Sequence, residues 1–97
     1  MSFKKRKEQI NNNMANSVEA ILPAEATLLY FSYDEKCFGN IVVAIEFENS
    51  KHTFHTDRGE IYYNGKMLCD SSYLYIEKED TFSKLLQMIK KEVLLCG

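Results

Sequence analysis

Three pairs of turn-forming residues recur between Gly39 and Cys69, and each pair separates short runs in which apolar and polar residues alternate. The pairs are Asn49-Ser50, Arg58-Gly59 and Asn64-Gly65. Asn-Gly between alternating runs is the strongest two-residue signal for a β-hairpin. This stretch therefore predicts three consecutive hairpins, and so an antiparallel meander.

Two-residue loops at these pairs would decide which side chains share a face of the sheet. The expected cross-strand pairs are Phe47–His52, Ile45–Phe54, Thr56–Ile61, Phe54–Tyr63 and Ile61–Leu68. That face is almost wholly apolar. The other face then carries a mixed acidic and aromatic set, which comprises Glu46, Glu48, Thr53, His55, Asp57, Glu60, Tyr62, Met67 and Cys69.

Further strands are expected on either side of the hairpins. Residues 27–33 alternate and are rich in β-branched and aromatic types, which places Leu29, Phe31 and Tyr33 on one side. An acidic turn over residues 34–40 leads into a second strand over residues 41–48. Residues 73–77 could add another strand, so the sheet is expected to have five or six strands.

A helix is predicted at each end of the chain. Residues 1–22 form the first, most clearly over 13–22, and Pro23 ends it. The second helix begins after Asp80 or Thr81, either of which can cap it, and Gly97 lies beyond its last turn. The two apolar stripes consist of Ile10, Met14, Val18 and Ile21, and of Phe82, Leu85, Leu86, Ile89 and Val93.

These elements predict an α+β fold in which both helices pack on one face of an antiparallel sheet. The covered face would carry Val43, Ile45, Phe47, Phe54, Ile61 and Leu68. Ninety-seven residues suffice for a single domain over residues 1–97. Residues 1–8 could form a flexible basic arm.

Charge is distributed unevenly along the chain. Four of the twelve basic residues lie at Lys4–Lys7, which leaves eight basic against fourteen acidic residues in the remainder. An acidic body repels nucleic acid and attracts basic proteins. No apolar run is long enough to span a membrane, and no apolar stretch of a secretion signal follows the basic residues, so a cytoplasmic location is expected.

The residue types that carry chemistry form no catalytic or metal-binding signature. The cysteines Cys37, Cys69 and Cys96 are widely spaced and are expected to be reduced thiols. His52 and His55 would point to opposite faces of one strand, which disfavours a shared metal ion. No phosphate-binding or dinucleotide-binding motif occurs, so no cofactor, no metal and no enzymatic activity are expected.

Four side chains of the open face are expected to converge around the Arg58-Gly59 turn: His55, Asp57, Glu60 and Tyr62. A histidine beside carboxylates could act as a general base. An ordinary solvated sheet face explains the same pattern and is favoured, because flat faces do not exclude water. The tyrosines on predicted strands equally suit a binding surface or plain strand structure.

The meander from Gly39 to Lys66 and the closing helix from Asp80 resemble the small immunity proteins of bacterial contact-dependent and polymorphic toxin systems. The resemblance lies in size, acidity and layout, and it assigns no individual residue. It implies a non-enzymatic inhibitor that binds a cognate toxin domain, often a basic nuclease. The residues expected to bind that basic partner are Glu46, Glu48, His55, Asp57, Glu60 and Tyr62.

Two other functions stay open at this point. The basic residues Lys4–Lys7 could grip phosphate in a nucleic-acid-binding or regulatory module, although a solvated terminus explains them as well. An enzyme acting through His55 is the third reading. Nucleic acid is the less favoured partner because the body of the chain is acidic.

Overall fold

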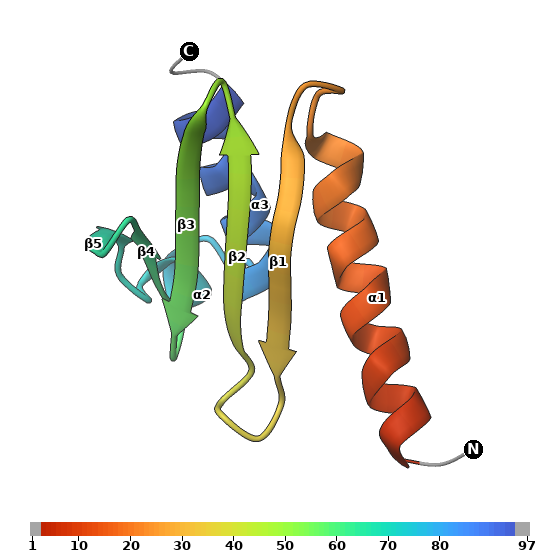
Figure 1. Ribbon diagram of the computed structural model, residues 1–97. Coiled ribbons are helices and arrows are strands. Elements are labelled where there is room, and N and C mark those ends of the chain that lie inside the picture. The colour runs from red at the N-terminus through yellow and green to blue at the C-terminus, as the bar shows by residue number, and fades with distance from the viewer. Residues whose placement is uncertain (1–2, 95–97) are drawn as a thin grey trace.

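A computed structural model describes the backbone of residues 3–94 and the side chains of residues 9–94. One five-stranded antiparallel sheet follows the order of the chain, with a helix before it and a helix after it (Figure 1). The elements are α1 (Phe3–Ile21), β1 (Thr27–Asp34), β2 (Asn40–Phe47), β3 (Ser50–Asp57), β4 (Glu60–Tyr63), β5 (Lys66–Cys69), α2 (Tyr73–Ile76) and α3 (Thr81–Ile89), which continues as a π-helical turn over Lys90–Leu94. The predicted α+β meander is confirmed.

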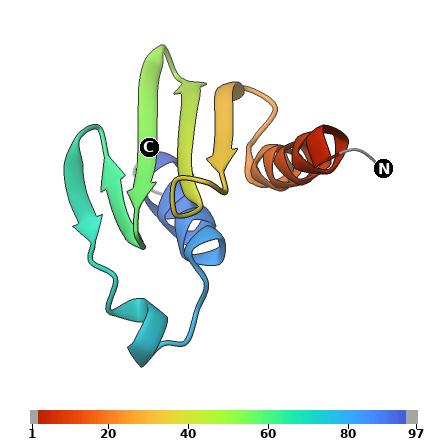
Figure 2. The ribbon, with the colours of Figure 1, turned by 90° about the horizontal axis from the view of Figure 1, so that it is seen from below.

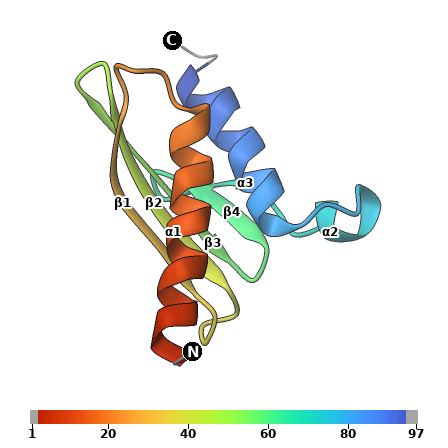
Figure 3. The same ribbon diagram turned by 90° about the vertical axis from the view of Figure 1, so that its right-hand side faces the viewer.

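Both long helices lie on the same side of the sheet (Figures 2 and 3). Helix α3 crosses beneath the strands, and α1 runs alongside β1 at the edge. The buried core takes residues from α1, β2, β3, β4, α2, α3 and the π-helical turn, and partly buried residues of β1 and β5 pack against it. It consists of Val18, Ile41, Val43, Ile45, Phe54, Ile61, Tyr73, Leu85, Ile89 and Val93. The opposite side of the sheet carries no described helix, and we call it the open face.

Local capping explains where α3 begins. Asp80 has an extended backbone, and its Oδ1 accepts a hydrogen bond of 2.8 Å from the backbone amide of Ser83. Such an N-cap satisfies one of the amides that a helix leaves unpaired, which is worth about 1 kcal/mol. Of the two capping residues expected from the sequence, Asp80 holds the role. Gly97, which was predicted to lie beyond the last turn of this helix, is outside the described residues, and so is Cys96.

Two of the three predicted turns form where the sequence placed them. Arg58-Gly59 and Asn64-Gly65 have positive φ angles at both positions, as a type I′ turn requires. Strand β3 accordingly pairs Thr56 with Ile61. Because both turns match the twist of the strands that they join, the register between β3 and β4 follows directly from the sequence.

The first hairpin turns one residue earlier than predicted. Glu48 and Asn49 occupy the turn, with φ angles of 53° and 64°, so Phe47 pairs with Ser50 rather than with His52. This register sets Phe54 opposite Val43 in the middle of the core instead of opposite Ile45. The packing outweighs the cost of about 1 kcal/mol for a glutamate in the left-handed region. A shift of two positions leaves the strand side chains on their predicted faces. Glu48, which was predicted on the open face, lies instead in the turn.

Two bulges move individual side chains between faces. In β1 the register shifts between Leu28 and Tyr30, so that Leu28 pairs with Ile45 over the core and Leu29 is turned outward, the reverse of the prediction. In β5 a shift sets Ile61 opposite Cys69 rather than Leu68. Cys69, predicted on the open face, instead packs against the core. Each bulge inserts one residue, which alternation alone does not reveal.

The strand predicted over residues 73–77 is wrong, because this segment forms the short helix α2. The Asp70 carboxylate accepts a 2.9 Å hydrogen bond from the Ser72 amide, which starts a helical turn. The Tyr73 hydroxyl then donates to the Gly59 carbonyl at 2.6 Å, with the ring buried. These tertiary contacts override the β-propensity of the aromatic and branched residues.

Helix α1 begins at Phe3, so the backbone of Lys4–Lys7 belongs to its first turns. The flexible arm predicted over residues 1–8 stays a prediction, because Met1, Ser2 and the side chains of residues 3–8 lie outside the described part. Along the described remainder of the helix, Val18 is fully buried and Met14 and Ile21 pack against the core, as the apolar stripe predicted. No helix within residues 3–94 combines the length and the apolar character needed to cross a membrane.

Candidate functional site

A row of side chains crosses all five strands of the open face. Consecutive cross-strand partners build it in the order Ser32, Val42, His55, Tyr62 and Met67. Val42 is 39% exposed and Met67 is 49% exposed, which is high for apolar residues of a sheet. The row therefore presents a band of apolar and aromatic surface across the sheet.

The centre of this row is a stacked pair. The rings of His55 and Tyr62 lie 4.6 Å apart and within 2° of parallel. The Tyr62 hydroxyl donates a hydrogen bond of 3.1 Å to Glu60 Oε1, and Asp57 is the cross-strand partner of Glu60. We call these four residues, His55, Asp57, Glu60 and Tyr62, the Tyr62 cluster.

The surroundings of the Tyr62 phenol raise its pKa. Partial burial raises the pKa of Tyr62 most, followed by its hydrogen bond to Glu60 and by the negative charges of Glu60 and Asp57. The Tyr62 phenol thus donates a hydrogen bond to Glu60, and the stacked rings lie beside two carboxylates.

The turn beneath the cluster is held from two sides. Asn40 Oδ1 accepts a 3.1 Å hydrogen bond from the Arg58 amide, which ties the turn to β2. On the other side the Gly59 carbonyl accepts from the Tyr73 hydroxyl. Asp57 and Glu60 flank this turn, so these hydrogen bonds fix their backbone positions.

The predicted six-residue site divides into two parts. His55, Asp57, Glu60 and Tyr62 come together, as predicted from the turn. Glu46 lies near the other end of β2, with Thr27 and Lys51 as its cross-strand partners. Glu46 follows Val42, the partner of His55, by four residues, which span about 13 Å along a strand. Glu46 is therefore distant from the Tyr62 cluster.

Glu48 also lies away from the Tyr62 cluster. It is a turn residue with a φ angle of 53°, and it does not belong to the face of a strand. Conversely, Val42 belongs to the row although it was not among the predicted site residues. Its position opposite His55 follows only from the observed β2–β3 register.

The two histidines are separated by the sheet, as the strand geometry predicted. His52 Nδ1 lies 2.7 Å from the Tyr63 hydroxyl, and the two rings are stacked 5.9 Å apart. Tyr63 also stacks on the buried ring of Phe54, which places His52 beside the core. Among the residues that the structure describes, no group of three or more histidine, cysteine or acidic side chains is arranged to hold a metal ion.

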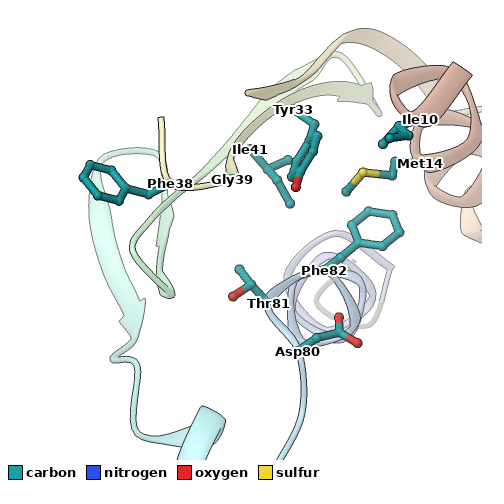
Figure 4. A pocket seen from close by; sticks show the side chains of 9 residues that line it. All are labelled: Ile10, Met14, Tyr33, Phe38, Gly39, Ile41, Asp80, Thr81 and Phe82. Carbon is teal, nitrogen blue, oxygen red and sulfur yellow. The ribbon is translucent and has the colours of Figure 1, made fainter. Parts of the chain in front are cut away.

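A pocket of about 330 Å³ lies on the covered side, between α1, the loop before β2 and the start of α3 (Figure 4). Its lining is mainly apolar and comprises Ile10, Met14, Tyr33, Phe38, Gly39, Ile41, Asp80, Thr81 and Phe82. We call it the α1–α3 pocket. The polar groups at its edge are too few to define a reaction.

Comparison of this chain with protein-family models, with curated proteins and with solved structures finds no match.

Proposed function

We propose that this chain is a non-enzymatic protein-binding inhibitor, and that it acts as an immunity protein that neutralises a cognate toxin with a basic surface, such as a nuclease. The observation that carries the proposal is the Tyr62 cluster, in which an aromatic stack and two carboxylates share a sheet face that no helix of residues 3–94 covers. Aromatic side chains in such positions are typical anchors of protein interfaces.

The charges of the cluster support a basic partner. Asp57 and Glu60 are directly opposite each other on neighbouring strands, and like charges in that position destabilise a sheet. The ion pairs of the described residues involve Lys84 and neither of these carboxylates. A lysine or arginine of a partner would relieve the repulsion, so the unfavourable pair has a purpose in binding.

The apolar flanks supply the remaining part of an interface. Val42 and Met67 extend the row on both sides of the stacked rings, and both are substantially exposed. Burial of such side chains around an aromatic anchor excludes water from the ion pairs at its edge. A binding surface explains the exposed apolar residues, the aromatic stack and the carboxylates together, whereas general-base catalysis by His55 explains none of the apolar residues.

The proposal is tested with the product of a neighbouring gene, if that gene encodes a large secreted protein with a basic C-terminal domain. A pull-down from the native host with mass spectrometry identifies the partner independently. Coexpression of this chain should restore growth to cells that produce the toxin domain. Tyr62→Ala should abolish that protection and speed dissociation, by up to about 2–4 kcal/mol in binding free energy. Tyr30→Ala, an exposed tyrosine on β1, is the matched control.

Charge reversal separates steering from anchoring. Asp57→Lys with Glu60→Lys should mainly slow association and weaken its dependence on salt. Glu46→Lys, at the other end of β2, should slow association much less and leave the dissociation rate unchanged. Surface-plasmon-resonance kinetics at two salt concentrations measure the difference. Protection that survives every open-face substitution, with the fold retained by circular dichroism, would refute this site. Binding of nucleic acid through α1 would instead favour the alternative based on Lys4–Lys7.

A further inference from the structure

Phe38, in the loop between β1 and β2, combines an exposed ring with an unfavourable backbone. The residue is 70% exposed, and its φ angle is 58°, in the left-handed region. Bulky residues rarely adopt that region, and such outliers are concentrated at functional sites. Figure 4 shows the ring directed away from the other side chains that line the α1–α3 pocket. Packing in the core therefore does not explain why a phenylalanine occupies this position.

The ring of Phe38 instead contacts an arginine of the neighbouring turn. The guanidinium carbon of Arg58 lies 4.4 Å from the ring centroid, which is a cation–π contact. The same loop also holds the backbone of Arg58, because Asn40 Oδ1 accepts a 3.1 Å hydrogen bond from the Arg58 amide. The Asn40 amide in turn donates to the Cys37 carbonyl at 2.9 Å, which closes the loop. Arg58 is thus held at two points, its amide and its guanidinium.

Two carboxylates adjoin Arg58 in the β3–β4 turn. Asp57 precedes it, Glu60 follows two residues later, and the two acids are cross-strand partners. We call Asp57 and Glu60 the acid pair. Arg58 is their nearest cation in the sequence, but the ion pairs of the described side chains involve Lys84 and neither of these acids. The Arg58 guanidinium lies on the Phe38 ring, and the acid pair has no arginine partner from its own turn.

The phenol of Tyr62 is sensitive to the charge of the acid pair. Burial raises the pKa of Tyr62 most, followed by its hydrogen bond to Glu60 and by the negative charges of Glu60 and Asp57. A guanidinium placed on these carboxylates would counteract their charge and so lower the pKa of Tyr62. Titration of Tyr62 therefore reports whether Arg58 lies on the ring of Phe38 or on the acid pair.

From this geometry we propose that Phe38 is a positioning residue, whose ring holds the guanidinium of Arg58 away from the acid pair and so keeps both carboxylates available to a basic partner. A cation–π contact and an exposed ion pair are of similar strength, so the ring can decide between the two positions of the guanidinium. Without the ring, Arg58 would turn onto the carboxylates beside it and reduce their attraction for an external cation. The identity of the partner rests on the proposed function, whereas the position of Arg58 concerns this chain alone.

Spectrophotometric titration of Tyr62 in the purified chain tests the position of Arg58. Phe38→Ala should move the titration to lower pH, because the freed guanidinium approaches the acid pair. The double variant Phe38→Ala, Arg58→Ala should return it toward the native pH. Phe38→Trp retains an aromatic face for the guanidinium and is the matched control, which should titrate like the native chain. A titration that Phe38→Ala leaves unchanged would overturn the inference, and so would a shift that persists after Arg58 is also removed.

Binding of a lysine decapeptide tests whether the acid pair is available to cations. At low salt, Phe38→Ala should weaken binding of this peptide by about two- to fivefold, the effect of one exposed ion pair, and removal of Arg58 as well should restore it. Tyr30→Ala, which removes an exposed ring on β1, should leave binding unchanged. A titration that responds to Phe38→Ala while the peptide binds all variants equally would contradict the proposed function at this surface but not the position of Arg58. Weaker binding with an unchanged titration would overturn the role of Phe38 and leave the proposed function standing.

Discussion

The two faces of the sheet are held by different kinds of interaction. On the covered face, Ile45, Phe54 and Ile61 are fully buried, and each shares its packing with residues from several strands and helices. On the open face, His55 and Tyr62 interact chiefly with each other and with Glu60. A substitution on the covered face therefore disturbs the whole core, whereas one on the open face affects only its neighbours.

The largest expected difference concerns adjacent residues of β3. Phe54→Ala should lower the free energy of unfolding by about 3–5 kcal/mol, because it removes a fully buried ring from the core. His55→Ala, on the other face, should cost less than about 1 kcal/mol. Urea denaturation measures both. Equal losses at the two positions would mean that the faces do not differ in the way described.

Two glycines with similar φ angles distinguish the cost of a close side-chain contact from the cost of backbone strain. Gly59 and Gly65 have φ angles of 92° and 86°, but a Cβ atom would meet Leu74 and Ser71 only at Gly59. Gly65→Ala should therefore cost about 1 kcal/mol from backbone strain alone. Gly59→Ala adds a close contact and should cost about 2–4 kcal/mol. Thermal unfolding of the two variants provides the comparison, and a Gly65→Ala variant that is the less stable of the two would contradict it.

A pH titration examines the open face without disturbing the core. The folded state raises the pKa of Tyr62, so the protonated phenol stabilises the fold. This contribution is complete below about pH 10, the pKa of an unfolded tyrosine, and is lost as the pH rises through the raised pKa. Glu60→Gln removes a charge that causes part of the rise and should move the titration of Tyr62 to lower pH. Ultraviolet absorbance of the phenolate follows the change, with Tyr62→Phe to identify the transition. Glu46→Gln should have no effect on this titration. An unchanged titration in Glu60→Gln would mean that Glu60 does not raise the pKa of Tyr62.

The smallest expected effect concerns the first turn, which joins β2 and β3 at one end of the sheet. Glu48 adopts a left-handed conformation that asparagine adopts more readily. Glu48→Asn should stabilise the chain by about 0.5 kcal/mol and raise its melting temperature by about 2–4 °C. Ser50→Asn, on the strand side of the turn, should give no such gain. A stabilised Ser50→Asn variant would favour the turn at Asn49-Ser50 after all.

Much of the fold could be read from local signals. The meander, the helices at both ends and the cap at Asp80 depend on residues close together in the chain, such as the Asn64-Gly65 pair. The bulges at Leu29 and in β5 could not be read in this way, nor could helix α2. Each of them depends on contacts with residues distant in sequence, for which alternation and propensity carry no information.

The candidate site shows the same division. Convergence of His55, Asp57, Glu60 and Tyr62 follows from one turn, and it was predictable because Arg58-Gly59 determines both neighbouring positions. The separation of Glu46 from that cluster required the geometry of a second strand pair. Acidic residues that share a face of a sheet can lie at opposite ends of it, and a face assignment alone does not measure that distance.

What the sequence by itself determined is the face of each side chain along the regular parts of β2, β3 and β4, because left-handed turn positions accept few residue types and a two-residue periodicity then assigns the side chains between them. The tertiary structure alone decided the register of the first hairpin, where the packing of Phe54 against Val43 outweighs the strain at Glu48. It also decided the helical form of α2, through the hydrogen bond from Tyr73 to Gly59. Local preferences are worth about 1 kcal/mol each, and burial of one large side chain in the core exceeds that.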